Sequence, residues 1–203
     1  LEALNTLLIF YRHVPSITHF PVFMGNIDML LEPYIQDEEE ARRLIRGFLI
    51  HCDRTFGSSF CHMNLGPTAT RAGRIILEVQ MELQNSIPNM TLIYDPDITP
   101  DDFAELAIKT ALACANPAFA YRPAYSADFE QRPFGICSCY NGLPIGGGAY
   151  TLSRLRLNKI ADQSDTVEDF FEKHLPHAVD TLCKFMEAKI RFLVEETPFF
   201  STH

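Results

Sequence analysis

The residues with the clearest chemical potential lie in one short segment, residues 134–148, which contains two cysteines and five glycines. An apolar approach leads to Cys137 and Cys139. Asn141 and Gly142 then offer a tight reversal, because both residues tolerate positive φ. Three successive glycines follow at 146–148, and because glycine loses much backbone entropy on ordering, they indicate a close approach of the backbone to a neighbour. We interpret the segment as a stiff finger with sulfur near its tip.

The same segment has a simpler interpretation. Cysteine is among the most often buried residue types and packs as a small hydrophobe. Cys137 and Cys139 can therefore be core residues, and a run of glycines can be a flexible loop. The local pattern alone leaves both interpretations open.

Composition narrows the class of protein. The chain has 203 residues, 47% of them hydrophobic and 21% charged, which is typical of a globular protein with a sizeable core. Its net charge of −9, without a basic stripe, argues against nucleic acid as a partner. No apolar run reaches membrane-spanning length and no signal peptide is apparent, so we expect no membrane partner and a cytoplasmic location. The cysteines are irregularly spaced, and Cys52, Cys114 and Cys183 are expected to be reduced core residues.

Hydrophobic periodicity predicts an α/β fold in which parallel strands neighbour one another. Pro21 should restrict the first strand to a sheet edge or a bulge, and Pro176 should kink or split the last helix. Residues 119–133 are expected to form a loop, and no boundary between domains is apparent. We expect strands over residues 17–25, 60–65, 88–94 and 150–157, and helices over 2–12, 37–52, 68–84, 101–115 and 167–196.

Two motifs carry a resemblance to a known family. Residues 89–94 read Asn-Met-Thr-Leu-Ile-Tyr, and residues 134–139 read Phe-Gly-Ile-Cys-Ser-Cys. Together they resemble the glycyl radical enzymes, with pyruvate formate-lyase a clear relative and the YjjI-type branch the most similar. The resemblance extends over most of the chain. Asn-Leu-Gly-Pro at residues 64–67 is also similar to the anaerobic ribonucleotide reductases of the same superfamily.

The resemblance implies a ten-stranded α/β barrel with a central cysteine hairpin loop, which meets a second loop that carries a radical glycine. A radical-SAM activase installs that glycyl radical, in a motif like Arg-Val-x-Gly-Tyr. The motif is absent here: the last glycine is Gly148, and the chain begins at Leu1 without Met. We therefore expect residues 1–203 to be a single partial barrel region that is inactive alone and binds no cofactor directly. The full-length protein is expected to be a homodimer.

The resemblance also implies roles for single residues. Cys139 takes the position of the thiyl radical, which abstracts hydrogen from a small organic substrate and must be held rigid and dry. Cys137 is either a second redox thiol or a core residue. Ser138 separates the two cysteines, whereas pyruvate formate-lyase has adjacent ones, and this argues against acyl transfer between sulfurs. Asn141 stands where the dehydratase branch has a glutamate base, and an amide cannot take a proton.

Substrate contacts are expected from His62, Asn141 and Arg122. His62 lies in a predicted strand that could face the barrel interior, although a lone histidine there is more often structural. Arg122, with Tyr121 and Tyr125 beside it, would suit a carboxylate or phosphate, and a surface loop explains these residues equally well.

Other functional classes remain open at this point. A metal-binding or redox module would use Cys137, Cys139, Cys61 and His62, although Cys-x-Cys lacks the usual zinc spacing. A cysteine hydrolase would use Cys139 as nucleophile with a distant histidine as base, drawn from His62, His174 and His177, but the sequence has no local signature for one.

Overall fold

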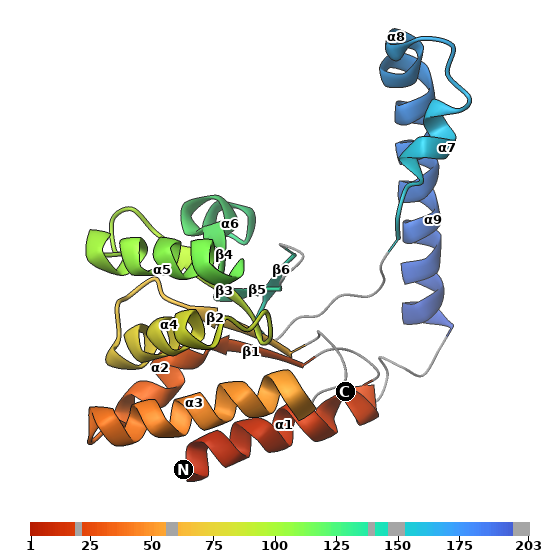
Figure 1. Cartoon of the computed structure of the whole chain (residues 1–203). Coiled ribbons are helices and arrows are strands. Elements are labelled where there is room, and N and C mark those ends of the chain that lie inside the picture. Colours follow the sequence, from red (N-terminus) through yellow and green to blue (C-terminus); the bar gives the residue numbers. More distant parts are fainter. Residues whose placement is uncertain (19–21, 56–60, 138–140, 146–152, 197–203) are drawn as a thin grey trace. The chain divides into compact units, whose positions relative to one another are not determined.

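The computed structural model describes residues 1–18, 22–55, 61–137, 141–145 and 153–196 (Figure 1). Its contacts divide the chain into two compact units, Leu1–Gly147 and Gly148–His203, which are described separately. The expectation of one barrel region over the whole chain stays a prediction.

A parallel four-stranded sheet forms the centre of the first unit, with its strands in chain order. This confirms the α/β class and the parallel neighbours, whereas the ten-stranded barrel is a larger structure than this sheet. The first strand lies at an edge, and its register shifts between Met24 and Asn26. An edge position was expected because of Pro21, which itself lies outside the described residues. The strands are β1 (Val22–Asn26), β2 (Cys61–Leu65), β3 (Asn89–Tyr94) and β4 (Ala118–Tyr121).

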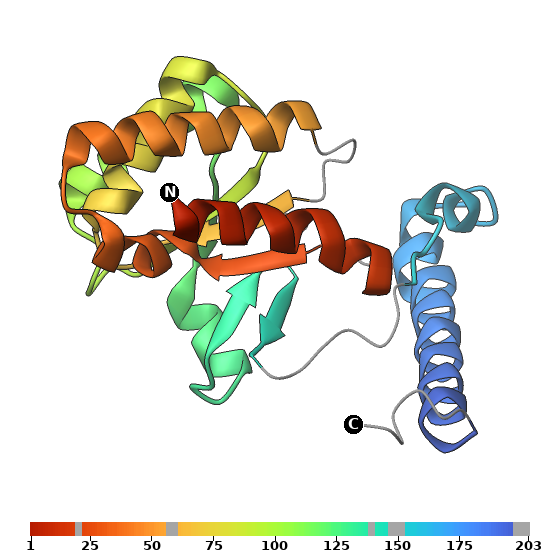
Figure 2. The same cartoon turned by 90° about the horizontal axis from the view of Figure 1, so that it is seen from below.

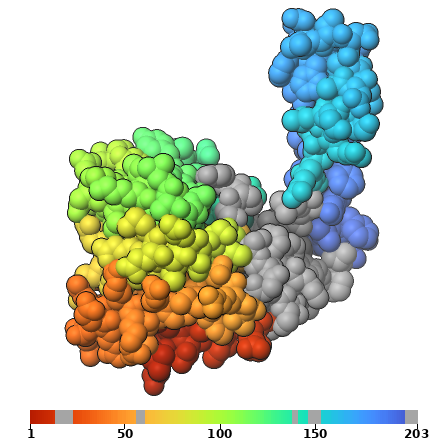
Figure 3. All heavy atoms as spheres, viewed as in Figure 1, coloured from red at the N-terminus to blue at the C-terminus, as the bar shows by residue number. Residues whose placement is uncertain are grey.

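The connecting helices cover one face of this sheet. Each strand pairs with the next one in the chain, and because such crossovers are right-handed they bring their helices to the same face. Figures 1 and 2 show α3, α4 and α5 side by side on that face, and Figure 3 shows their side chains in continuous contact. The helices of this unit are α1 (Glu2–Thr18), α2 (Ile27–Leu31), the 3-10 turn η1 (Glu32–Tyr34), α3 (Glu38–Thr55), α4 (Arg71–Leu83), α5 (Asp101–Cys114) and α6 (Arg122–Asp128).

Short-range signals set the starts of these helices. The Asp37 carboxylate accepts the Glu40 N–H at 2.7 Å. The acidic residues in the first turn of α3 are favoured by the helix dipole, as expected. Thr70 caps α4 by accepting the Gly73 N–H at 2.9 Å.

The expected loop over residues 119–133 is wrong, because this stretch contains most of β4 and all of α6.

An antiparallel hairpin lies on the other face of the sheet. Its strands are β5 (Phe134–Ile136) and β6 (Gly142–Pro144). Figures 1 and 2 show it across the sheet from α3 and α4. The predicted cysteine finger is therefore a hairpin, and the face on which it lies is the one that α3, α4 and α5 leave uncovered.

The regular structure of the second unit is helical over the described residues. It contains α7 (Leu157–Ala161), α8 (Val167–Asp169), the π-helical segment η2 (Phe170–His174) and α9 (Leu175–Glu195). Pro176 was expected to kink or split the last helix. The backbone instead stays helical from Val167 to Glu195 and changes from π- to α-helix just before Pro176, so the chain is not split there.

The predicted strand over residues 150–157 is wrong where it is described. Residues 153–156 have no regular structure and α7 begins at Leu157. The alternation of Arg and Leu in this stretch resembles the pattern of a strand. In the structure, however, Leu155 lines a pocket beside α9. None of the helices over the described residues has the length and apolar character that a membrane span requires.

Candidate functional site

The two faces of the sheet carry different side chains. Along β2, Cys61, Met63 and Leu65 point into the main core beneath the helices. His62 and Asn64 therefore point to the hairpin face, because side chains alternate along a strand. The strand register puts Phe23 beside His62 and Thr91 beside Asn64 on that face. His62, Asn64 and Thr91 are all buried, so the hairpin face is polar at its centre.

All four strands of the sheet contribute to holding the stem of the finger. The Phe23 ring of β1 lies against Gly135, where a Cβ atom would come within 2.0 Å of its Cε1 atom. Asn64 of β2 binds the backbone of Ile136. The Ile136 side chain packs with Ile93 of β3 and Ala120 of β4. Backbone and side chain of the stem are thus fixed to the sheet together.

Helix α6 holds the hairpin from its other side. The Phe134 ring lies 5.7 Å from that of Tyr125 and 5.6 Å from that of Phe129, between ring centroids. A Cβ atom on Gly142 would come within 2.5 Å of the Phe129 ring. Close approach therefore explains the glycines at 135 and 142. The glycines at 146–148, for which it was predicted, lie outside the described residues.

The expected reversal at Asn141 and Gly142 is wrong. Gly142 pairs with Ile136 inside the hairpin, and the Cys137 N–H donates to the Asn141 carbonyl at 3.0 Å. Asn141 and Gly142 therefore both lie on the β6 side of the hairpin, and residues 138–140 lie outside the described residues. Cys137 is half-buried at the end of the stem, whereas Cys139 lies outside the described residues.

His62 is buried on the hairpin face, with 4% of its surface exposed. Burial lowers the pKa of its imidazole, so the ring is neutral at pH 7. Its carbonyl accepts the Tyr11 hydroxyl at 2.6 Å. His62 therefore shares a face with the finger stem, in a setting that disfavours charge.

The metal-module hypothesis finds no support in the described residues. Cys61 precedes His62 and points to the opposite face, so these two side chains cannot hold one ion together. Cys61 lies beside Cys52 in the core, where a hydrogen bond between the thiols and burial raise the pKa of Cys52. Within the described part of the chain, no three His, Cys, Asp or Glu side chains gather in a metal-binding group.

Arg122 lies at the carboxyl end of β4, as the first residue of α6. Its guanidinium donates to the Asp95 carboxylate at 2.7 Å, and this hydrogen bond lowers the pKa of Asp95. A substrate carboxylate at Arg122 would therefore share the guanidinium with Asp95. Tyr121 is exposed, whereas Tyr125 packs on the hairpin.

Sequence reasoning assigned no role to Asn64. It is fully buried, and its amide is bound on both sides by the backbone next to Cys137. The available signal was an asparagine between apolar residues in a strand that is buried throughout, since a buried amide requires hydrogen-bond partners.

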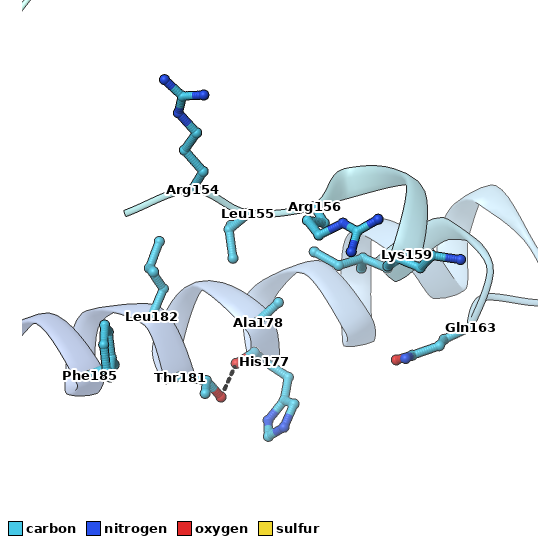
Figure 4. A pocket seen from close by; sticks show the side chains of 11 residues that line it. Arg154, Leu155, Arg156, Lys159, Gln163, His177, Ala178, Thr181, Leu182 and Phe185 are labelled. Carbon is cyan, nitrogen blue, oxygen red and sulfur yellow. Dashed lines mark hydrogen bonds between the residues drawn. The ribbon is translucent and has the colours of Figure 1, made fainter. Parts of the chain in front are cut away.

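A pocket of about 500 Å³ lies in the second unit, between the segment around α7 and the helix α9 (Figure 4). Its floor is apolar, while Figure 4 shows Arg154 pointing away from α9. The Thr181 hydroxyl donates to the His177 carbonyl at 2.8 Å. The lining residues are Arg154, Leu155, Arg156, Lys159, Ile160, Gln163, His177, Ala178, Thr181, Leu182 and Phe185.

The other histidine proposed as a hydrolase base in this unit has an acidic partner. His174 Nε2 lies 3.1 Å from the Asp169 carboxylate, one turn earlier in the same helical region. This is a local ion-pair geometry at half-buried side chains. The Thr181 hydroxyl binds the backbone carbonyl of His177 and not its imidazole, so this contact does not pair a nucleophile with a base.

Known proteins resemble this chain over its whole length. An uncharacterised protein of Haemophilus influenzae is 46% identical over 201 residues, which cover 99% of this chain and 39% of that relative. The uncharacterised protein YjjI of Escherichia coli K12 is 41% identical over 203 residues, again 39% of its length. The chain thus spans about two fifths of these relatives, and no solved structure matches it. The family model described as glycyl radical enzyme YjjI-like matches residues 1–203, so the chain belongs to the YjjI-like family of glycyl radical enzymes.

Proposed function

We propose that this chain carries the thiyl-radical finger of a glycyl radical enzyme that acts on a small organic substrate. Family membership supports the class of enzyme. The observation that carries the proposal is the anchoring of the stem before Cys137, which Phe23, Asn64, Ile93 and Ala120 hold on the face away from α3, α4 and α5. A reactive sulfur requires such rigidity and exclusion of water.

The glycyl radical of the family, proposed for a segment outside residues 1–203, would supply the unpaired electron, and a cysteine thiol of this finger would give up its hydrogen atom to it. The residues of this chain fit that chemistry in two respects. The stem of the hairpin leads directly to Cys137, and glycines at 135 and 142 let this stem pack closely. The Cys139 sulfur would then take a hydrogen atom from a substrate C–H bond, which breaks as S–H re-forms and leaves the electron on carbon.

The remaining roles follow from the surroundings of each residue. Cys137 would act as a second thiol if the reaction consumes two electrons, and otherwise packs at the end of the stem. His62 is buried and neutral, so it would donate or accept a hydrogen bond rather than attract an anion. Arg122 would bind a carboxylate beside Asp95, and Asn141 would contact substrate through its amide. A radical-SAM activase, a homodimer and a cytoplasmic location complete the proposal.

The test uses the full-length protein, activated under anaerobic conditions by its radical-SAM enzyme and observed by electron paramagnetic resonance in D₂O. Thiol hydrogen exchanges with solvent. If hydrogen passes between sulfur and the radical glycine, deuterium replaces the glycine α-hydrogen and the splitting of the signal collapses. We expect this exchange in wild type and its loss in Cys139→Ser, with the radical still formed. Cys137→Ser is the matched control, two residues away in the same finger.

Two results would contradict the proposal. One is a wild-type protein that forms no organic radical after treatment with its radical-SAM enzyme. The other is unchanged deuterium exchange in Cys139→Ser. Reduction of a ribonucleotide by the activated protein, lost in Cys137→Ser as well as in Cys139→Ser, would instead move the assignment to the reductase branch.

A further inference from the structure

Asn64 makes two hydrogen bonds to a single residue of the finger stem. Its side-chain oxygen accepts the Ile136 N–H at 2.8 Å, and its Nδ2 donates to the Ile136 carbonyl at 2.7 Å. Both residues are buried, with 0% of Asn64 and 1% of Ile136 exposed. The pairing joins residues 72 positions apart in the chain, across the sheet-to-hairpin contact.

This geometry follows from the hairpin register. Cys137 bonds to Asn141 across the hairpin, so the backbone groups of the preceding residue, Ile136, point away from β6. Left without partners in a buried site, each of these backbone groups would destabilise the fold. The side-chain amide of an asparagine carries one acceptor oxygen and one donor nitrogen. It therefore supplies both hydrogen bonds that a neighbouring strand would otherwise make to Ile136. Aspartate has no donor when ionised, and an apolar residue offers neither.

We call the two hydrogen bonds between Asn64 and Ile136 the Asn64 clamp, and its position in the fold indicates what it holds. Ile136 immediately precedes Cys137, and its side chain is held by Ile93 and Ala120. Asn64 itself lies in β2, an inner strand with neighbours on both sides. The clamp therefore ties the backbone that enters the cysteine turn to one of the most constrained parts of the sheet.

We propose that Asn64 is a positioning residue that sets the location and orientation of the cysteine finger relative to its hydrogen-transfer partner. This inference rests on the proposed function. It assigns to Asn64 no contact with substrate and no role as acid or base. Its effect is transmitted through the backbone of Ile136.

The structure offers a matched control. Asn116 also makes two side-chain hydrogen bonds to the backbone, elsewhere in the unit. Its Oδ1 accepts the Met90 N–H at 3.0 Å, and its Nδ2 donates to the Pro88 carbonyl at 2.8 Å. It is also buried, with 4% exposed. Asn116 holds the start of β3 rather than the stem of the finger, so equal substitutions there remove the same kind of hydrogen bonds without touching Ile136.

The experiment compares Asn64→Ala and Asn64→Asp with Asn116→Ala and Asn116→Asp in the full-length protein. The first readout is amide hydrogen exchange of the peptide that contains Ile136 and Cys137, which needs no radical. The second is the rate at which the glycyl-radical signal exchanges hydrogen in D₂O. We expect both Asn64 variants to lose protection at Ile136 and to slow radical exchange by about 10- to 100-fold, as for small misplacements of reacting groups. The Asn116 variants should retain the wild-type rate.

Acidification provides a rescue that a general loss of folding would not give. Protonating the carboxyl introduced by Asn64→Asp restores one donor toward the Ile136 carbonyl, so protection should return as pH falls. Lost protection with an unchanged radical exchange rate in Asn64→Ala would overturn the inference alone. An Asn64→Ala protein that does not fold is replaced by Asn64→Asp, whose two protonation states supply the comparison. A wild-type protein without radical exchange would instead contradict the proposed function, and the two failures are therefore distinguishable.

Discussion

The two faces of the parallel sheet differ although the same strands build both. The face toward α3, α4 and α5 is apolar, with Met63, Leu65, Met90 and Leu92 in one continuous core. The opposite face carries the buried polar side chains of His62, Asn64 and Thr91, and Asn64 binds the hairpin. One face supplies stability through burial, whereas the other holds a particular segment in a particular place.

The difference follows from the connectivity of the sheet. Strands in chain order with right-handed crossovers bring the helices to one face, so the other face is available for a loop from later in the chain. Stability and placement are therefore largely separable in this molecule. Substitutions on the helix face should change the free energy of unfolding, and substitutions on the hairpin face should change the position of the finger.

The largest expected effect is on the helix face. Phe103 is fully buried in α5, and Phe103→Ala should lower the free energy of unfolding by about 3–5 kcal/mol through lost burial and a cavity. Urea unfolding followed by circular dichroism measures this loss. Phe10→Ala, at a residue of the same unit that is 49% exposed, is the control and should change stability by less than about 0.5 kcal/mol. An equally small effect at Phe103 would contradict the assignment of the main core.

Asp28 is an exception within the helix-face layer, because it is a fully buried carboxyl. Its Oδ2 accepts the Gly66 N–H at 3.0 Å, while its Oδ1 has no hydrogen-bond partner among the described residues. Burial raises its pKa from 3.8 to about 6. The folded state therefore keeps a proton that the unfolded state loses, so this contribution to stability is complete below pH 4 and is lost as pH rises through 6.

Asp28→Asn should remove that dependence on pH. Relative to wild type, the variant should gain on the order of 2–3 kcal/mol between pH 4 and pH 7, from a pKa difference of about two units. Unfolding curves at both pH values give the difference directly. A wild-type and variant pair whose stability difference is constant with pH would show that the Asp28 pKa is not raised.

Some parts of this fold could be predicted from the sequence and others could not. The strands β2 and β3 and the helices α3, α4 and α5 were predicted because local periodicity and caps determine them. Strand β4 was missed because Phe119 and Tyr121 sit beside prolines and aromatics that resemble a loop, and only pairing with β3 makes them a strand. The alternation of Arg and Leu around Arg154 predicted a strand, but residues 153–156 have no regular structure.

The candidate site shows the same limit. The cysteine hairpin was predicted because glycines and apolar residues announce it locally. Asn64 was not assigned a role, because its partner lies 72 residues away and no local pattern reports a long-range hydrogen bond. His62 was correctly expected in a strand, but its burial follows from the hairpin that covers that face.

The hairpin face can be broken sterically at Gly135. A Cβ atom there would approach the Phe23 ring to 2.0 Å, so Gly135→Ala must displace that ring or the stem, at a cost of about 1–3 kcal/mol. Phe23→Ala in the same chain should return part of this loss, giving a coupling that is absent between Gly135 and Phe103. Additive effects of Gly135→Ala and Phe23→Ala on unfolding would argue against their contact.

The smallest effect concerns Arg122, the residue for which a structural and a substrate-binding role compete. Its pair with Asp95 lowers the Asp95 pKa, so its contribution is present above the unfolded pKa and disappears as pH falls. Arg122→Gln should therefore cost about 0.5–1 kcal/mol at pH 7 and less at acidic pH, where Asp95 begins to be protonated. Arg71→Gln, which breaks the exposed pair with Glu32, is the matched control. If Arg122→Gln leaves stability unchanged at both pH values, the guanidinium is not committed to Asp95, and a role in binding a substrate carboxylate becomes the stronger interpretation of this residue.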